Sequence, residues 1–280
     1  MLFHFIDPER GSVGKKGIRL FPPFRPFSLS RFLFGLLVGG ALFAAHPALA
    51  QEESAIDIVR KADELTRGET QEGIYRMVIV RPDWERTMVF EFWSEGTEKS
   101  FIRVREPVKE RGVSFLKIER EMWQYVPRIN RVIKIPPSMM LQSWMGSDFT
   151  NDDLVKESSV VEDYEHKLLG REMMDEGEAY KLELTPKPEA PVAWDRMIEW
   201  IRIEDFMPLR AEFFNERGER VRTMIYSDIK EMGGRTVPAR FELIEEKKPG
   251  RKTIMVLEEV VYDRPIGRNV FTQANLRRAR

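Results

Sequence analysis

Residues 122–135 read MWQYVPRINRVIKI, and the pattern of this stretch recurs along most of the chain. Its two halves, Met122–Val126 and Arg131–Ile135, are short runs rich in β-branched and aromatic residues. Runs of this kind are typical of β-strands, and Pro127 between them marks a turn. The stretch therefore predicts two neighbouring strands joined by a short loop.

Similar runs continue on both sides of this stretch. They occur at Ile74–Arg81, Thr87–Trp93, Phe101–Arg105, Val113–Ile118, Tyr164–Leu169, Ala179–Leu184, Met197–Ile203, Leu209–Phe214, Val221–Ile229, Val237–Ile244 and Thr253–Tyr262. Turn-forming residues separate them at hairpin spacing, for example at Asn215–Gly218 and Gly233–Gly234. We therefore expect about a dozen antiparallel strands, and one sheet of that length must curl, close or split.

Two segments depart from the strand pattern. Residues 55–67 predict an amphipathic helix, because Ser54 is placed to cap it and Gly68 to end it. Its apolar stripe consists of Ala55, Ile58, Ala62 and Leu65. Residues 136–154 are apolar without alternation, which indicates a short helix or loop laid across the sheet. The proline-rich stretch Thr185–Pro191 has the composition of a domain linker, but strand patterns continue on both sides, which favours a long hairpin loop in one domain.

The first fifty residues have the pattern of a secretory signal peptide. A basic start is followed by the 14-residue apolar run Phe32–Ala45 and by the small-x-small site that ends at Ala50. A membrane-spanning helix needs roughly 20 apolar residues, so a permanent N-terminal anchor is the less favoured alternative. We expect cleavage after Ala50, export to the periplasm, and a single domain over residues 51–280.

Composition excludes several classes of function. The chain has no cysteine, which excludes disulfides and a lipidated N-terminal cysteine. Two of the three histidines lie in the leader, so His166 alone remains for a catalytic triad, and a Cys/His zinc site is excluded. The leader carries six basic and two acidic residues, so residues 51–280 have a net charge near −5, against −1 for the whole chain. This acidity argues against nucleic acid as a partner. We expect no enzyme, no cofactor and no permanent membrane anchor.

Large apolar side chains gather on one face of several predicted strands. The candidates are Met88, Phe90, Phe92, Trp123, Tyr125, Ile133, Ile135, Tyr180, Leu182 and Leu184. The chain also has 14 methionines, and this adaptable side chain suits surfaces that repack around varied apolar partners. A filled core and a ligand cavity both produce this pattern, so the strands alone leave the choice open.

Charged clusters give weaker signals. Asp148, Asp152 and Asp153 lie close in sequence, but the glycine and the final glutamate of a calcium-binding loop are missing, so we expect capping or turn roles and no metal site. Arg128, Arg131 and Lys134 fit either a solvated strand edge or a contact with an acidic partner or headgroup.

Together these features resemble the LolA-like superfamily, and within it the branch described as outer-membrane lipoprotein-sorting proteins. The most specific stretch runs from Trp123 to Pro136 and continues through Ser143–Phe149 to Asp153–Leu154. Supporting stretches are Glu199–Ile201, Pro208–Arg210 and the terminal Phe271–Thr272 with Leu276.

The resemblance implies a mainly β fold, a strongly curved antiparallel sheet that forms a half-open barrel. It assigns the lid role to the first helix and to Pro136–Trp144, with the lid candidates Ile58, Ala62, Leu65, Met139, Met140 and Trp144. The implied function is a soluble periplasmic carrier that holds acyl chains of a lipid or lipoprotein. Such a carrier serves an inner-membrane exporter and an outer-membrane acceptor. The alternative is a non-carrying accessory or sensor protein that docks on an envelope transporter or signalling complex.

Overall fold

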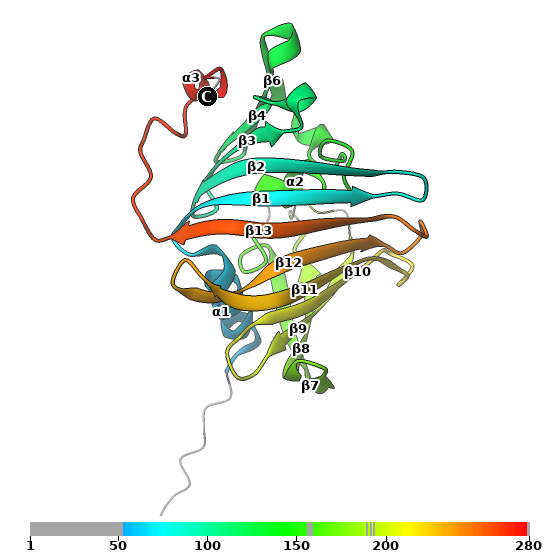
Figure 1. Cartoon of the computed structure of the whole chain (residues 1–280). Helices are drawn as coiled ribbons and strands as arrows, with labels where there is room; N and C mark the ends of the chain where they lie inside the picture. The colour runs from blue at the N-terminus through cyan, green and yellow to red at the C-terminus, as the bar shows by residue number, and fades with distance from the viewer. Residues whose placement is uncertain (1–52, 156–158, 189, 191, 193, 279–280) are drawn as a thin grey trace, which may run out of the picture. The chain divides into compact units, whose positions relative to one another are not determined.

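The computed structural model describes residues 53–155, 159–188, 190, 192 and 194–278, which all belong to the unit Gln51–Arg280. The predicted leader and its cleavage site lie outside the described residues. Thirteen strands form one antiparallel sheet in the order β6-β5-β4-β3-β2-β1-β13-β12-β11-β10-β9-β8-β7 (Figure 1). Their bounds are β1 Thr70–Val80, β2 Glu85–Glu95, β3 Lys99–Glu106, β4 Ser114–Ile118, β5 Glu121–Val126, β6 Arg131–Ile135, β7 Tyr164–Met174, β8 Gly177–Pro186, β9 Arg196–Arg202, β10 Pro208–Phe214, β11 Arg220–Met232, β12 Arg235–Glu245 and β13 Lys252–Tyr262.

Each of the thirteen runs predicted from the sequence corresponds to one of these strands. The pairing of β1 with β13 joins two meanders, and β6 and β7 form the two edges. Within the described residues no ladder joins these edges, so the curved sheet stays open, and the predicted fold class is confirmed. The proline-rich stretch after β8 leads to β9, its direct neighbour in the sheet. It is therefore a hairpin connection.

The first helix, α1, spans Ala55–Arg67 as predicted. The Ser54 hydroxyl accepts a hydrogen bond from the Asp57 N–H, and Gly68 ends the helix with a φ of +66°, a conformation that glycine adopts without steric cost. Two shorter helices are α2, Asn151–Val155, and α3, Gln273–Leu276. Single 3-10 turns lie at Val108–Glu110, Pro127–Ile129 and Pro137–Met139.

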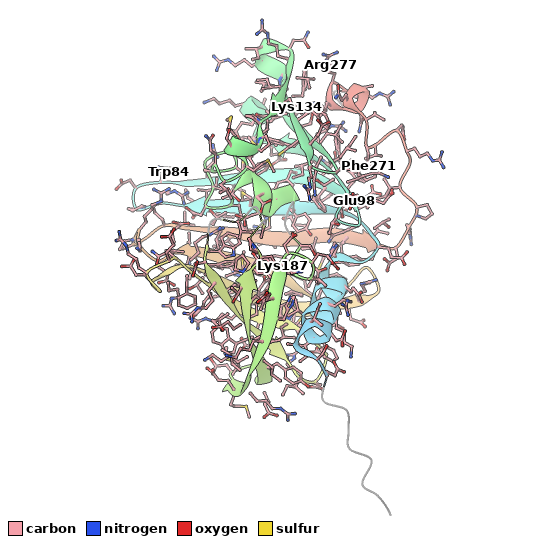
Figure 2. All side chains as sticks on the ribbon, turned by 180° about the vertical axis from the view of Figure 1, so that it is seen from behind. Trp84, Glu98, Lys134, Lys187, Phe271 and Arg277 are labelled. Carbon is pink, nitrogen blue, oxygen red and sulfur yellow. The ribbon has the colours of Figure 1, made fainter. Side chains whose placement is uncertain are left out.

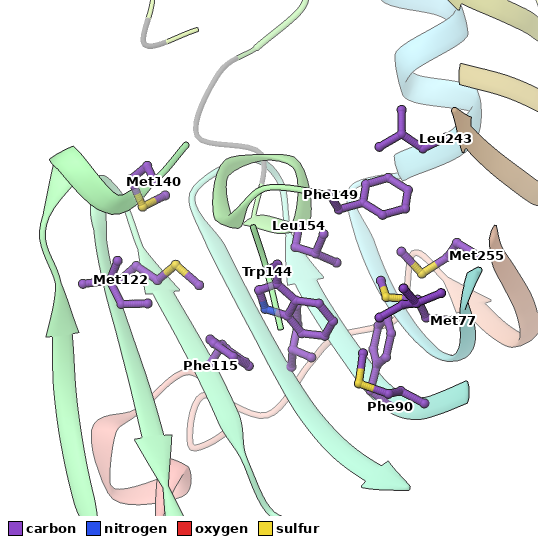
Figure 3. Packing of buried hydrophobic residues seen from close by; sticks show 14 residues of the cluster. Met77, Phe90, Phe115, Met122, Met140, Trp144, Phe149, Leu154, Leu243 and Met255 are labelled. Carbon is purple, nitrogen blue, oxygen red and sulfur yellow. The ribbon is translucent and has the colours of Figure 1, made fainter. Parts of the chain in front are cut away.

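Two segments cover the inner face of the sheet. The central segment, residues 136–155, places Trp144, Phe149 and Leu154 against the inward side chains of β1–β6 (Figure 3). Helix α1 buries Ile58 and Val59 against the inner face of β7–β10. The interior therefore consists of two packed regions, one under each covering segment.

Three arginines of the sheet hold the central segment in place. At the end of β1, the Arg81 guanidinium forms a buried ion pair of 2.8 Å with Asp148 and donates to the Gly146 carbonyl at 2.9 Å. Arg222 of β11 forms a second ion pair of 2.8 Å with Asp153, and Arg86 of β2 donates to the Met145 carbonyl. The segment is thus tied to both halves of the sheet.

The outer face of the sheet is covered as well. After β13 the chain runs back along the outside, and α3 comes to lie beside β4 (Figure 1). Phe271 and Leu276 pack on Phe101 and Leu116, and the Ser114 hydroxyl donates to the Leu276 carbonyl at 2.8 Å. Apolar side chains on β3–β5 are therefore buried on both faces of the sheet.

Candidate functional site: an internal cavity under two covering segments

A cavity of about 300 Å³ lies where the two packed regions meet. It is bounded by α1, by the central segment and by the inner faces of strands from both halves of the sheet. This volume falls at the lower end of the range of small-molecule sites, roughly 300–1,000 Å³. Its apolar and aromatic lining consists of Val59, Ala62, Tyr75, Phe90, Phe92, Phe149, Leu154, Val160, Tyr164, Trp194, Met197, Pro208, Ala211, Phe213, Met224, Tyr226, Phe241 and Met255.

An aromatic wall on β1 and β2 forms one side of the cavity. Tyr75 pairs directly with Phe90 across the two strands, and their rings stack with centroids 5.7 Å apart. Phe92 meets Tyr75 edge-on at 5.8 Å, and Trp144 of the central segment contacts Phe90 at 5.5 Å. Burial raises the pKa of Tyr75 far above its usual value, so the phenol is neutral. The wall is therefore uncharged.

Carboxylates from α2 and β9 line another part of the cavity. Asp153 forms an ion pair with Arg222, and Asp152 and Glu199 lie near Tyr164. Burial raises the pKa of Tyr164, and the negative charges of Glu199 and Asp152 raise it further. The Tyr164 hydroxyl accepts a hydrogen bond of 2.9 Å from the Trp194 indole N–H. Three acidic residues thus contribute to this side of the cavity.

The polar remainder of the lining lies where α1 ends and β1 begins. Asp63, Thr66 and Arg67 come from the last turns of α1, and Gln71 follows on β1. The facing positions on β2, the β2–β3 turn and β3 are Ser94, Gly96, Thr97, Lys99 and Ser100. Figure 2 labels Trp84 and Glu98, which lie just beyond the two ends of β2. This polar group lies at the end of β2 nearer to Glu98.

The structure brings three of the predicted site residues to the cavity and places the others elsewhere. Phe90, Phe92 and the lid candidate Ala62 line it. The other candidates buried in the two packed regions are Met88, Ile135, Leu182, Leu184, Ile58, Met140 and Trp144. Tyr180 packs against the region under α1, and Leu65 packs on a separate cluster that includes Trp200. Ile133 and Met139 are exposed.

Trp123 and Tyr125 require a correction, because they do not face the hollow. Trp123 pairs with Lys134, and Met122 with Ile135, so Met122 and Ile135 point inward while Trp123 points outward. On the outer face both aromatic residues pack with Phe271 and Leu276. Their apolar character reflects the C-terminal segment that covers this face.

Most of the lining was not among the residues predicted from the sequence. Tyr75, Met224 and Tyr226 stand next to the apolar residues Ile74 and Ile225 on β1 and β11, so alternation does not single out the inward face there. Trp194 and Phe149 lie outside the strands, and no local sequence pattern marks them.

His166, the one histidine of the described residues, does not line the cavity. It hydrogen-bonds the Val160 carbonyl through Nε2 at 2.7 Å. Within the described ranges no cluster of three or more His, Cys, Asp or Glu side chains is placed to hold a metal ion. Among the helices of the same residues, none has the length and apolar character needed to cross a membrane.

Comparisons with known proteins identify relatives by family and by fold. A family model with the description "Uncharacterized protein" matches residues 96–278. Among curated proteins, none matches the chain.

Three solved structures share the architecture. A DUF1329 family protein from Desulfovibrio piger is 23% identical, covers 79% of this chain and 97% of its own, and gives a TM-score of 0.73. A domain described as an outer membrane lipoprotein-sorting protein, from Vibrio parahaemolyticus, is 19% identical, with coverages of 80% and 98% and a TM-score of 0.71. A LolA superfamily protein from Nitrosomonas europaea is 24% identical, with coverages of 80% and 99% and a TM-score of 0.69.

Proposed function

The chain belongs to the family whose model spans its residues 96–278 and has the fold of the LolA superfamily, and on this basis we propose that it is a lipid carrier. In this proposal it binds acyl chains of a lipid or lipoprotein in the internal cavity. The observation that supports it is a cavity of about 300 Å³ with an aromatic and aliphatic lining, kept open between two packed regions.

The free energy of acyl-chain burial is sufficient for such a role. Each CH₂ removed from water contributes about 0.8 kcal/mol, so a long chain contributes on the order of 10 kcal/mol. Loss of translational freedom and the ordering of side chains oppose binding by several kcal/mol. The net affinity is then moderate, which suits a protein that must also release its cargo.

The covering segments suggest how cargo enters and leaves. Helix α1 is amphipathic and buries only one stripe, and the central segment is held by arginine contacts and by the burial of Trp144, Phe149 and Leu154. In this proposal both segments lift while the strands stay paired. Release then proceeds downhill, to a partner that binds the cargo more tightly. We assign this exchange to the periplasm, between an inner-membrane exporter and an outer-membrane acceptor, and we assign no catalytic step to the protein.

A substitution that fills the cavity tests the proposal. Met224 of β11 lines the cavity, so Met224→Trp places an indole in the space an acyl chain would occupy. The control is Met173→Trp, because Met173 lies on edge strand β7 with 75% of its surface exposed. We expect Met224→Trp to weaken binding of a long-chain amphiphile at least tenfold, as measured by titration calorimetry, and Met173→Trp to leave it unchanged. Equal affinity of both variants and the wild type would contradict the proposal.

The accessory-protein alternative is favoured by one observation. Several large apolar side chains are exposed on loops and edges, among them Val108 with 75% and Ile129 with 56% of their surface accessible. Exposed apolar groups of this kind suit docking to a protein. In that case the wild-type protein binds no amphiphile, and substitution of Met224 has no effect on ligand titrations.

A further inference from the structure

A row of four polar side chains crosses the inner face of the sheet at one end of the cavity. It consists of Gln71 on β1, Ser94 on β2, Ser100 on β3 and Lys117 on β4. Gln71 pairs with Ser94, Ser94 with Ser100 and Ser100 with Lys117, so all four point to the same face. Each is at most 6% exposed. A parallel apolar row lies two residues further along β2, β3 and β4 on the same face, and it consists of Phe92, Ile102 and Phe115.

Burial of this polar row has a cost that packing alone does not explain. Moving a hydroxyl from water to a buried site without a hydrogen-bond partner costs free energy, whereas an alanine at the same site has no such cost. The Gln71 amide donates to the Tyr75 hydroxyl at 3.0 Å, and the Lys117 ammonium donates to the Thr97 carbonyl at 2.5 Å. The Ser100 hydroxyl has no hydrogen-bond partner among the residues that the structure describes, and Ser100 lines the cavity.

A second unsatisfied donor faces the same space from α1. Arg67 lines the cavity, and its side chain is 18% exposed. One guanidinium nitrogen is paired with Asp63, but Nε has no partner within the described part of the chain. At this end of the cavity, the Ser100 hydroxyl and the Arg67 Nε are therefore two donors without a partner among the described residues.

We propose that the polar row and Arg67 bind the anionic headgroup of a single-chain amphiphile, whose acyl chain lies along the aromatic wall. The shared chemistry is a negatively charged oxygen group at the end of one chain, either a carboxylate or a phosphate. The Ser100 hydroxyl and the Arg67 guanidinium donate to it. This inference rests on the proposed carrier function and adds the class of cargo.

The rest of the lining sets the orientation of this ligand. The polar row continues the face of the aromatic wall, because Gln71 lies on the same face of β1 as Tyr75, and Ser94 on the same face of β2 as Phe90 and Phe92. An anionic headgroup is therefore directed to the polar row, and the chain to the wall of Tyr75, Phe90 and Phe92.

The test compares headgroups on the same acyl chain. Hexadecanoate and palmitoyl-lysophosphatidylglycerol are the anionic probes, and monopalmitoylglycerol is the neutral one, each titrated below its critical micelle concentration. We expect at least one of the anionic probes to bind about tenfold tighter than monopalmitoylglycerol, or tighter still. The reason is that hydrogen bonds to charged groups are stronger than those between neutral groups. Which anionic probe binds tighter identifies the headgroup as carboxylate or phosphate.

Matched variants locate the headgroup. Ser100→Ala and Arg67→Gln should each reduce the preference for the anionic probes by roughly fivefold or more. The affinity for monopalmitoylglycerol should stay unchanged, which also shows that the cavity is intact. The controls are Ser227→Ala and Arg76→Gln, which alternate with cavity residues on β11 and β1 and point outward. An anionic preference that persists in both site variants, or equal wild-type affinity for all probes, would overturn the inference. Failure of every probe to bind the wild type would instead refute the carrier function itself.

Discussion

The buried ion pair between Arg81 and Asp148 provides a quantitative test of how the central segment is held. Their side chains are 6% and 2% exposed, so neither charge is well solvated. Replacing Arg81 by Met leaves the carboxylate without its main counterion and the Gly146 carbonyl without its donor. Breaking a buried pair from one side costs about 3–5 kcal/mol. Asp148 keeps a hydrogen bond of 2.7 Å from the Thr253 hydroxyl and a weaker ion pair of 3.8 Å with Arg251. We therefore expect a loss of stability near the lower end of this range, about 3 kcal/mol.

Equilibrium denaturation in urea, followed by circular dichroism, measures this loss. Arg81→Met should lower the free energy of unfolding by about 3 kcal/mol. The control is Arg76→Met, because Arg76 forms a half-exposed pair with Glu258 at 2.6 Å, and such pairs contribute about 0–1 kcal/mol. The double variant Arg81→Met/Asp148→Asn should lose less than the sum of the two single variants. A loss for Arg81→Met no larger than that for Arg76→Met would refute this account of the segment's attachment.

Two further predictions concern the aromatic wall and pH. Phe90→Glu puts an unpaired charge at a residue that is only 1% exposed, so we expect the free energy of unfolding in urea to fall by several kcal/mol. A folded variant with full ligand binding would show that this face of β2 does not line the cavity. Burial holds the pKa of His166 below its usual 6.5, so the unfolded chain takes up this proton first as the pH falls. The wild type should therefore lose stability from about pH 7 downward relative to His166→Gln, and parallel pH profiles of the two would contradict this.

The strand pattern was enough to predict the antiparallel strands, because each buried face imposes a period of two on its strand, whereas the half-open form of the sheet was implied by the family resemblance. Helix α1 was predictable with both ends, since Ser54 and Gly68 mark them by their own chemistry. The number of strands required the sheet to curl, close or split, and the structure has a curved sheet that stays open within the described residues.

The candidate site was only partly predictable, for two physical reasons. Alternation shows that Trp123 and Tyr125 share a face, but not that the C-terminal segment covers that face and makes it apolar. The polar row emerges only from the register of four strands, because Ser94 and Ser100 taken singly are ordinary residues at strand ends. Contacts between segments far apart in sequence, such as Arg81 with Asp148, leave no local signal at all.

Native mass spectrometry, with lipid extraction, on the protein purified gently from its own cells tests the central claim most directly. The account predicts a stoichiometric ligand with one acyl chain and an anionic headgroup, which Met224→Trp protein should lack. A ligand-free mass that stays unchanged when fatty acids, lysophospholipids and lipopeptides are added would contradict the carrier function and favour a docking role.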